Sequence, residues 1–353
     1  MKSVHSLEKL LNTAPDKDAF LAALASFETP DVVIDDDALD RYVQTLRPPR
    51  GLAPWSEYIG KNETLEQDFI ELAVSTVQQG GYLYEDPATG RALKWEINGS
   101  GSKALLSKMD QARNAGILPA LHIQDPKEAR SVLKDFFKDA PFAKERLDLW
   151  CEIAAPESVA RLKAVFNSAA KNDGSFSFDF RHTLALRDAL PRGLKDPFLK
   201  KAGLIPLLFA GVAASKGVKV DVDGVLPADY RLPQTGHNVG ILRFSQRLVD
   251  ILEANIVVTD KHPVVAQIRA QIILAGEKIL QKQKTKDVGI ALPHLDGDFW
   301  FAGRLFDSDP ATMNNSKRAV REALEACRVE SSFKKDGFMQ TSAKPINVET
   351  LRF

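Results

Sequence analysis

Apolar residues recur at helical spacing along most of this chain. In residues 263–283, for example, Val264, Ile268, Ile272 and Ile279 form a continuous stripe on one face. The same periodicity predicts helices over residues 6–11, 16–27, 38–46, 66–78, 103–114, 126–137, 157–169, 197–215, 245–254 and 317–327. Pro206 should kink or break the helix over 197–215. A chain dominated by this pattern is expected to fold as packed helices.

The period changes to that of a strand in two places. Residues 82–84 and 93–95 carry aromatic and apolar side chains around an Asp-Pro-Ala-Thr-Gly turn at 86–90, which predicts a β hairpin within residues 80–97. Residues 176–180 alternate Phe with polar residues, a pattern typical of a strand or of an aromatic loop packed on helices. The fold class expected is therefore mainly α, with one small β hairpin or sheet.

The domain organisation has few markers. A length of 353 residues allows one large or two ordinary domains. We find no internal repeat, low-complexity segment or obvious linker. We expect an N-terminal helical segment over residues 1–60 and a main helical domain over 61–353, with one continuous unit as the alternative.

Composition and charge limit the functional class. Hydrophobic residues make up 44% of the chain and charged residues 27%, which favours a globular core over disorder. The 47 basic and 47 acidic residues give no net charge, so the global electrostatic signature of a nucleic-acid-binding protein is missing. Cys151 and Cys327 are far apart, which fits a reducing compartment. With no apolar run of membrane-spanning length and no signal-peptide region, we expect a soluble cytoplasmic protein without a membrane partner.

Several common active-site motifs are absent from the sequence. It contains no GxxxxGK[ST] loop, no GxGxxG after a strand, no HExxH and no GxSxG. The six histidines never fall at the spacing of a metal-binding pair. We therefore expect no metal and no cofactor, and any chemistry should come from isolated carboxylates.

The stretch Ala-Asp-Tyr-Arg-Leu-Pro-Gln at residues 228–234 is the most informative in the chain. It places Asp229 beside an aromatic residue, an arginine and a turn containing Pro233. Asp229 could face a cavity as a catalytic carboxylate. Alternatively, it could cap a helix that begins near Pro233.

These residues, with Gly-Ile-Leu at 240–242, resemble the core signature of the queuosine salvage protein family. Other segments resemble the family in the same order over roughly residues 65–305: 101–105, 113–117, 186–188, 198–202, 268–270 and 298–300. Members of that family are queuosine nucleotide glycosylases. The resemblance implies an N-glycosidase that releases the base from a modified nucleoside or its 5′-monophosphate. It also implies a helical fold related to helix-hairpin-helix DNA glycosylases.

The resemblance also implies roles for residues near the signature. Asp229 would be the catalytic carboxylate, and Tyr230 and Arg231 would position the sugar or a phosphate. Lys200 and Lys201, near a helix start, would bind the 5′-phosphate. The alternatives are a packed aromatic for Tyr230, a surface cation for Arg231 and a solvated helix face for the two lysines.

Aromatic residues and a second acid would complete the site. Asp298 and Trp300 would line the base pocket, with the indole stacking on the base. Trp95 and Phe198 would form aromatic walls. For the three aromatic residues, packing in the core is the alternative.

One departure from the family pattern concerns the base pocket. The family's Asn-Phe-x-Phe-Trp segment should fall near residues 66–76, but this chain has no Trp there. We therefore expect a base pocket that differs from that of typical members.

Two other functional classes remain open. One is a DNA glycosylase acting on a modified base, which would need a basic surface and a nucleic-acid partner. We favour a small nucleoside or nucleotide over a nucleic acid as the partner. The other class is a non-catalytic nucleoside-binding or base-binding protein on the same fold.

Overall fold

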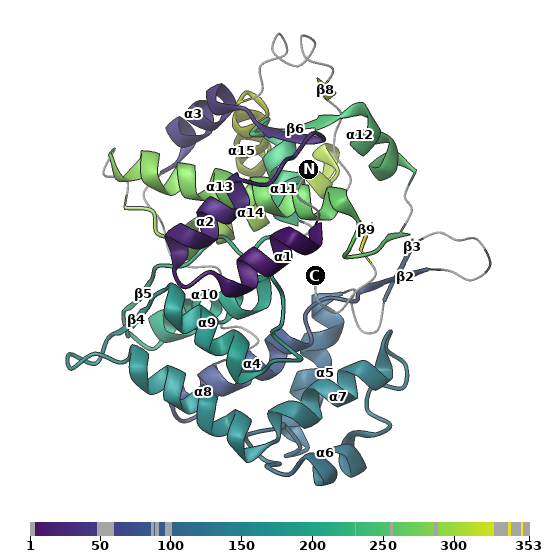
Figure 1. Ribbon diagram of the computed structural model, residues 1–353, viewed down its shortest axis with the longest axis vertical. Coiled ribbons are helices and arrows are strands. Elements are labelled where there is room, and N and C mark those ends of the chain that lie inside the picture. The colour runs from purple at the N-terminus through teal and green to yellow at the C-terminus, as the bar shows by residue number, and fades with distance from the viewer. Residues whose placement is uncertain are drawn as a thin grey trace. The chain divides into compact units, whose positions relative to one another are not determined.

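The fold is mainly α, as the sequence predicts (Figure 1). The computed structural model describes residues 4–47, 60–85, 88, 92–95, 101–229, 231–254, 257–285, 289–327, 338–339 and 347–348. The chain divides into two compact units. Unit 1 comprises residues 1–52 and 225–347, and unit 2 comprises residues 53–224 and 348–353. Residues 1–52 thus belong to the same compact unit as residues 225–347.

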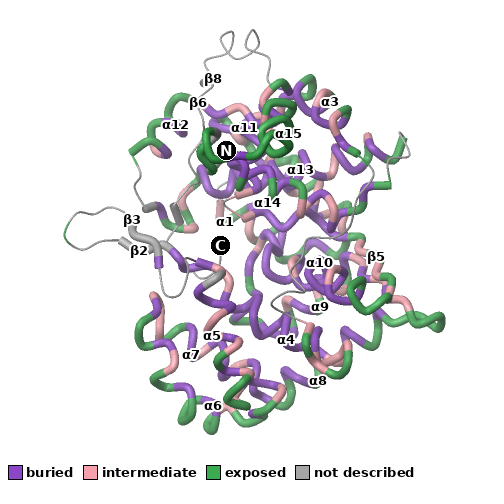
Figure 2. Tube along the Cα trace, turned by 180° about the vertical axis from the view of Figure 1, so that it is seen from behind, coloured by how far each residue is buried: buried purple, intermediate pink, exposed green. Residues whose placement is uncertain are grey.

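Unit 1 is a group of helices around one long central helix. Its helical elements are α1 (Val4–Thr13), α2 (Lys17–Ala25), α3 (Asp36–Thr45), α11 (Arg231–Asn238), α12 (Gln246–Glu253), α13 (Pro263–Lys284), α14 (Leu292–Asp307), the 3-10 turn η2 (Pro310–Thr312) and α15 (Asn315–Glu325). The central helix α13 contacts α2, α3, α11 and α14 and is buried along most of its length (Figure 2). A helix that is apolar on several faces requires such neighbours on several sides.

A small antiparallel sheet joins the two chain segments of unit 1. β1 (Val32–Ile34) pairs with β6 (Leu242–Ser245), with Val32 opposite Phe244, and β6 pairs in turn with β8 (Phe338–Met339). Asp35, directly after β1, donates its N–H to the Ile241 carbonyl at 2.8 Å. The Asp35 carboxylate also accepts the Ala38 N–H and so caps α3. The remaining strands of this part of the chain are β7 (Val257–Val258) and β9 (Asn347–Val348), the latter at the boundary between the chain segments of the two units.

Unit 2 is a second helical body with its own core. Its helices are α4 (Leu65–Val77), α5 (Ser102–Asn114), α6 (Pro126–Leu133), α7 (Ala143–Ile153), α8 (Pro156–Ala169), α9 (Phe180–Ala189) and α10 (Lys200–Ser215). The sequence signal before α6 is confirmed, because Asp125 accepts the N–H groups of Lys127 and Glu128 and Pro126 takes the first helical position. α10 runs without interruption through Pro206, so the predicted break does not occur.

Both strand-like segments of unit 2 form strands. The hairpin of β2 (Leu83–Glu85) and β3 (Ala92–Lys94) is confirmed, with Tyr84 opposite Leu93. β4 (Phe176–Phe178) pairs in parallel with β5 (Val220–Val222). The sheet of β1, β6 and β8 and the pairing of β4 with β5 add to the single small sheet expected from the sequence.

The strand β4 also contributes to the aromatic core of unit 2. Phe69 stacks on Phe178 with ring centroids 5.6 Å apart, and Phe166 and Phe209 meet Phe69 at 5.5 and 5.4 Å. Rings at these distances are attracted beyond their buried area alone. Phe69 is fully buried in this cluster.

Candidate functional site

Asp229 lies immediately before α11 and is half-buried. Its Oδ1 accepts the main-chain N–H groups of Arg231 at 2.8 Å and Leu232 at 3.1 Å. This is the geometry of a helix cap, so the capping role considered from the sequence is present. Oδ2 has no hydrogen-bond partner among the residues that the structure describes. One oxygen therefore fixes the carboxylate, whereas no described residue uses the lone pairs of the other.

The backbone before Asp229 is held from the central helix. Arg269 of α13 is 4% exposed, and its Nε donates to the main-chain carbonyl of Ala228 at 3.2 Å. Ala228 is fully buried. The position of the Asp229 backbone therefore depends on a buried arginine.

Helix α11 packs closely against α14. Thr235 donates from Oγ1 to the Phe299 carbonyl at 2.8 Å. A Cβ added at Gly303 would lie 2.7 Å from both Arg231 Cγ and Thr235 Oγ1, so glycine permits this approach. Arg231 and Thr235 of α11 therefore both lie against α14 at Gly303.

Among the described Asp and Glu residues of unit 1, Asp298 of α14 has the carboxyl with the clearest pKa shift. Solvent reaches its side chain, but surrounding protein atoms exclude enough water to raise the pKa of its carboxyl to about 6. Burial raises the pKa of the Tyr42 hydroxyl well above its usual value, and the charge of Asp298 raises it further. The Tyr42 ring also packs on Phe299 with a centroid distance of 5.4 Å.

The other candidates in unit 1 differ in their surroundings. Trp300 is half-buried, and the Arg304 guanidinium lies 5.0 Å from its ring centroid. This distance allows a cation–π contact on one face of the indole. Arg231 is half-buried at the start of α11. Tyr230 lies outside the described residues.

The two lysine candidates belong to unit 2, at the start of α10. Lys201 is 1% exposed, and its Nζ donates to the Val77 carbonyl at 2.8 Å. Burial, followed by the charges of Lys200 and Arg146, holds the pKa of Lys201 well below its usual value. Lys200 is 6% exposed, so neither lysine lies on a solvated helix face.

An internal carboxylate already occupies the start of α10. Asp196 is buried and accepts the N–H groups of Phe198 at 3.2 Å and Lys200 at 2.8 Å. The first amide of this helix, that of Lys200, therefore already has a partner within the protein.

The aromatic wall candidates are part of the packing of unit 2. Phe198 is 4% exposed and Trp95 is 3% exposed. The Arg146 guanidinium lies 5.2 Å from the Trp95 ring centroid, inside a set of hydrogen bonds to the carbonyls of Gln78, Gly80 and Gly81. The segment where the family pattern expects a Trp lies in α4, whose Phe69 belongs to the aromatic core.

The structure thus divides the candidates into two sets. Asp229, Arg231, Asp298 and Trp300 lie on the packed pair α11 and α14 of unit 1, whereas Trp95, Phe198, Lys200 and Lys201 lie in unit 2.

Three residues not assigned to the site from the sequence also contribute in unit 1: Tyr42, Thr235 and Arg269. The sequence carries a partial signal for Arg269, a charged residue inside the apolar pattern of α13. No comparable pattern marks Tyr42 or Thr235.

Two searches of the described residues were negative. They contain no group of three or more His, Cys, Asp or Glu residues close enough to hold a metal ion. Within the same residues, no helix is both long and apolar enough to cross a membrane.

Comparison with known proteins supports the resemblance stated from the sequence. Residues 214–304 match the family described as queuosine salvage protein. This range contains Asp229, Arg231, Arg269, Asp298 and Trp300. A search of curated proteins gave no match.

Proposed function

We propose, from the match of residues 214–304 to the queuosine salvage family, that this protein is an N-glycosidase. The match supports a role in queuosine salvage. In our proposal the substrate is a queuosine-like, deazapurine-type nucleoside or its 5′-monophosphate. The products are the free base and either ribose or ribose 5-phosphate. We also propose a cytoplasmic location, which agrees with the buried free thiols of Cys151 and Cys327.

The geometry of Asp229 carries this proposal. Cleavage of the bond between the ribose anomeric carbon and the base nitrogen leaves the electron pair on the base and positive charge on the sugar. A fixed carboxylate oxygen near that carbon stabilises the charge most when it needs no reorganisation. Asp229 has this property, because two helix amides hold Oδ1 while Oδ2 has no partner in the described chain.

Water completes the reaction. A hydroxyl group from water adds to the anomeric carbon, and the departing base gains a proton. Asp229 Oδ2 could stabilise the sugar cation while water attacks, or form a transient ester with the anomeric carbon that water then cleaves. Both routes use the same oxygen and give the same products.

We assign the proton on the departing base to Asp298. An acid with a pKa of about 6 is protonated in a useful fraction of molecules near neutral pH and can donate to a leaving group. In this proposal Trp300, which is half-buried on the same helix, stacks on the base.

The decisive experiment measures release of free base. The full chain would be incubated with queuosine and its 5′-monophosphate, and queuine would be followed by liquid chromatography with mass detection. Asp229→Asn is the test variant, and Asp18→Asn, an exposed acid on α2 of the same unit, is the matched control. We expect release by the wild type and Asp18→Asn but at least 100-fold less by Asp229→Asn.

Other substrates distinguish the competing classes. Release of a base only from modified DNA would replace this proposal with a DNA glycosylase. Tight binding of the nucleotide with no release of base by the wild type would instead identify a binding protein.

A further inference from the structure

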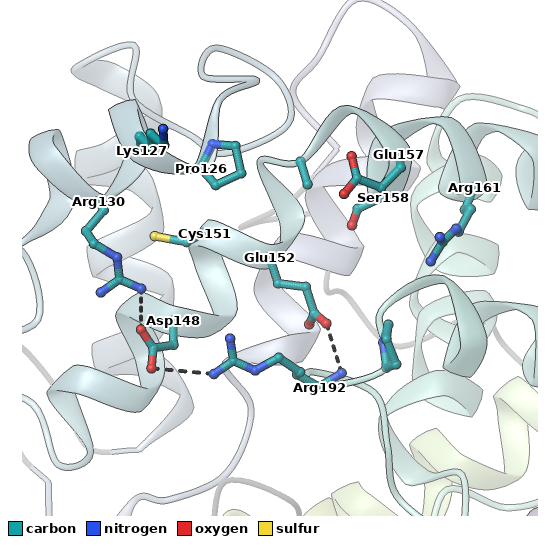
Figure 3. Close-up of a pocket in the computed structure, with 12 residues that line it drawn as sticks. Pro126, Lys127, Arg130, Asp148, Cys151, Glu152, Glu157, Ser158, Arg161 and Arg192 are labelled. Atoms are coloured by element: carbon teal, nitrogen blue, oxygen red, sulfur yellow. Dashed lines mark hydrogen bonds and ion pairs between the residues drawn. The ribbon is translucent and has the colours of Figure 1, made fainter.

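A pocket of about 530 Å³ lies within unit 2. It is formed by α6, α7 and α8 together with residues 191–192, which follow α9 (Figure 3). None of the candidate site residues discussed above lines it. Its lining is rich in charged side chains. What the pocket can bind depends on which of these side chains already form ion pairs within the protein.

Two acids of the pocket are engaged within the protein. Asp148 forms an ion pair with Arg130 and a second contact with Arg192 at 3.4 Å. Glu152 accepts the main-chain N–H groups of Arg192 and Gly193, each at 2.9 Å. Figure 3 shows these pairs as dashed lines along one wall of the pocket.

Donors on the facing wall, by contrast, have no partner among the described residues. Ser158 lines the pocket and is only 4% exposed, yet its hydroxyl makes no hydrogen bond within the described chain. Most of the Ser158 residue is buried, but its hydroxyl oxygen is open to the pocket, so a ligand or water in the pocket can accept its hydrogen bond. The Arg161 guanidinium, one turn further along α8, likewise has no acceptor in the described chain, and both side chains line the same pocket (Figure 3).

The beginning of α8 adds to this set of donors. Its N-cap is Ala155, which offers no side-chain acceptor, and Pro156 takes the first helical position. The Glu157 N–H has no acceptor among the described residues. An uncapped helix start carries partial positive charge and binds anions through such amides.

We propose that this pocket binds the phosphate group of a small phosphate monoester or inorganic phosphate. The group would accept hydrogen bonds from the Ser158 hydroxyl and the Glu157 N–H and would pair with Arg161. Phosphate fits because it is doubly charged near neutral pH and its oxygens accept from several donors at once. The proposal does not depend on the glycosidase assignment, because it uses none of the residues of α11 or α14.

The Glu157 side chain allows a test in which a substitution should strengthen phosphate binding rather than weaken it. Its carboxylate lines the pocket, is exposed and has no cationic partner in the described chain. This charge opposes a bound dianion at short range. Its removal should therefore strengthen phosphate binding.

Calorimetric titration of the full chain with inorganic phosphate in a phosphate-free buffer at pH 7.5 tests the site. We expect Arg161→Gln and Ser158→Ala each to raise the Kd by about tenfold, as for loss of a hydrogen bond to a charged group. Glu157→Gln should lower the Kd. Arg181→Gln, which removes an exposed arginine from α9 outside the pocket, is the charge-matched control and should leave the Kd unchanged.

The outcomes separate this site from the proposed active site. Asp229→Asn should bind phosphate at the pocket as the wild type does, whatever its activity. Comparison of ribose 5-phosphate with inorganic phosphate shows whether a monoester or the free ion binds more tightly. Absence of phosphate binding by the wild type, or equal Kd values for Arg161→Gln and Arg181→Gln, would overturn the proposal.

Discussion

Arg269 holds the main-chain carbonyl of Ala228, the residue directly before Asp229, through a hydrogen bond of 3.2 Å from its Nε. Both Arg269 and Ala228 are buried, so solvent competes little for this contact. The carboxylate of Asp229 is therefore positioned from two directions, by the central helix α13 behind it and by the first amides of α11 ahead of it.

This contact predicts a positioning role for Arg269. Arg269→Lys keeps a positive charge but loses the Nε donor, so the Asp229 backbone should shift. We expect kcat to fall by about 10- to 100-fold with little change in KM, because small displacements of a catalytic group reduce rate more than binding. Steady-state kinetics on queuosine 5′-monophosphate gives the measurement, and Arg247→Lys, at an exposed arginine of the same unit, is the control. Equal losses in both variants would remove the positioning role.

Asp229 itself combines capping and proposed catalysis, and two substitutions separate these roles. Asp229→Asn retains a capping oxygen but not the charge, so turnover should fall by about 10²–10³ with a similar melting temperature. Asp229→Ala loses both and should also destabilise the protein by about 0.5–2 kcal/mol. Thermal unfolding and the queuine assay on both variants provide the comparison. A fully active Asp229→Asn protein would leave the residue with a capping role alone.

Gly303 predicts a packing effect transmitted to the same site. In Gly303→Ala the new methyl group would meet Arg231 and Thr235 at 2.7 Å and push α11 away from α14. Overpacking of this kind costs about 1–3 kcal/mol of stability. Urea unfolding should show this loss, and Thr235→Ala in the same chain should recover part of it because one of the two clashes is removed. A Gly303→Ala protein as stable as the wild type would show that the helix pair is less tightly packed than described.

Asp298 predicts a pH dependence of stability. Its carboxyl pKa is about 6 in the folded protein against an ordinary value of 3.8, so the folded state favours the protonated acid. The unfolded chain loses this proton first as pH rises, and the cost of ionising Asp298 in the folded protein grows between about pH 4 and pH 6. Asp298→Asn removes that cost. The gain in urea midpoint over the wild type should be larger at pH 7.5 than at pH 5, whereas Asp18→Asn should show no such difference; a gain independent of pH would contradict the shifted pKa.

Local signals in the sequence predict much of this fold. The Asp-Pro pair at residues 125–126 marks the start of α6. The Asp-Pro-Ala-Thr-Gly segment at residues 86–90 marks the β2–β3 hairpin. Each signal acts over only a few residues. The helices α7, α9 and α14 were not predicted. α14 contains Gly297 and Gly303, and glycine lowers helix propensity. Gly303 is needed because α11, which is distant in the sequence, packs closely against it.

The burial of charged side chains, by contrast, cannot be inferred from local sequence signals. The pair Lys200 and Lys201 in the sequence suggests a phosphate site or a solvated face, but Lys201 reaches the Val77 carbonyl inside unit 2. That outcome depends on a partner 124 positions away in the chain. Asp229 shows the opposite case, because its cap partners are two and three residues ahead. The sequence therefore carries the cap signal itself, whereas the half-burial of Asp229 and its support from Arg269 require the tertiary structure.

The pairing of β1 with β6 has a consequence for how the protein forms in the cell. As the chain leaves the ribosome, Val32 emerges long before its partner Phe244, and α1 to α3 must wait for α13 to be made. The entropy of closing so long a loop grows only logarithmically with length, so the finished unit loses little stability by this arrangement. The folding rate is reduced more, because contacts between residues distant in the sequence form slowly. A nascent chain stalled before residue 242 should therefore expose the apolar faces of its first helices to chaperones, and release of that arrest should bury them.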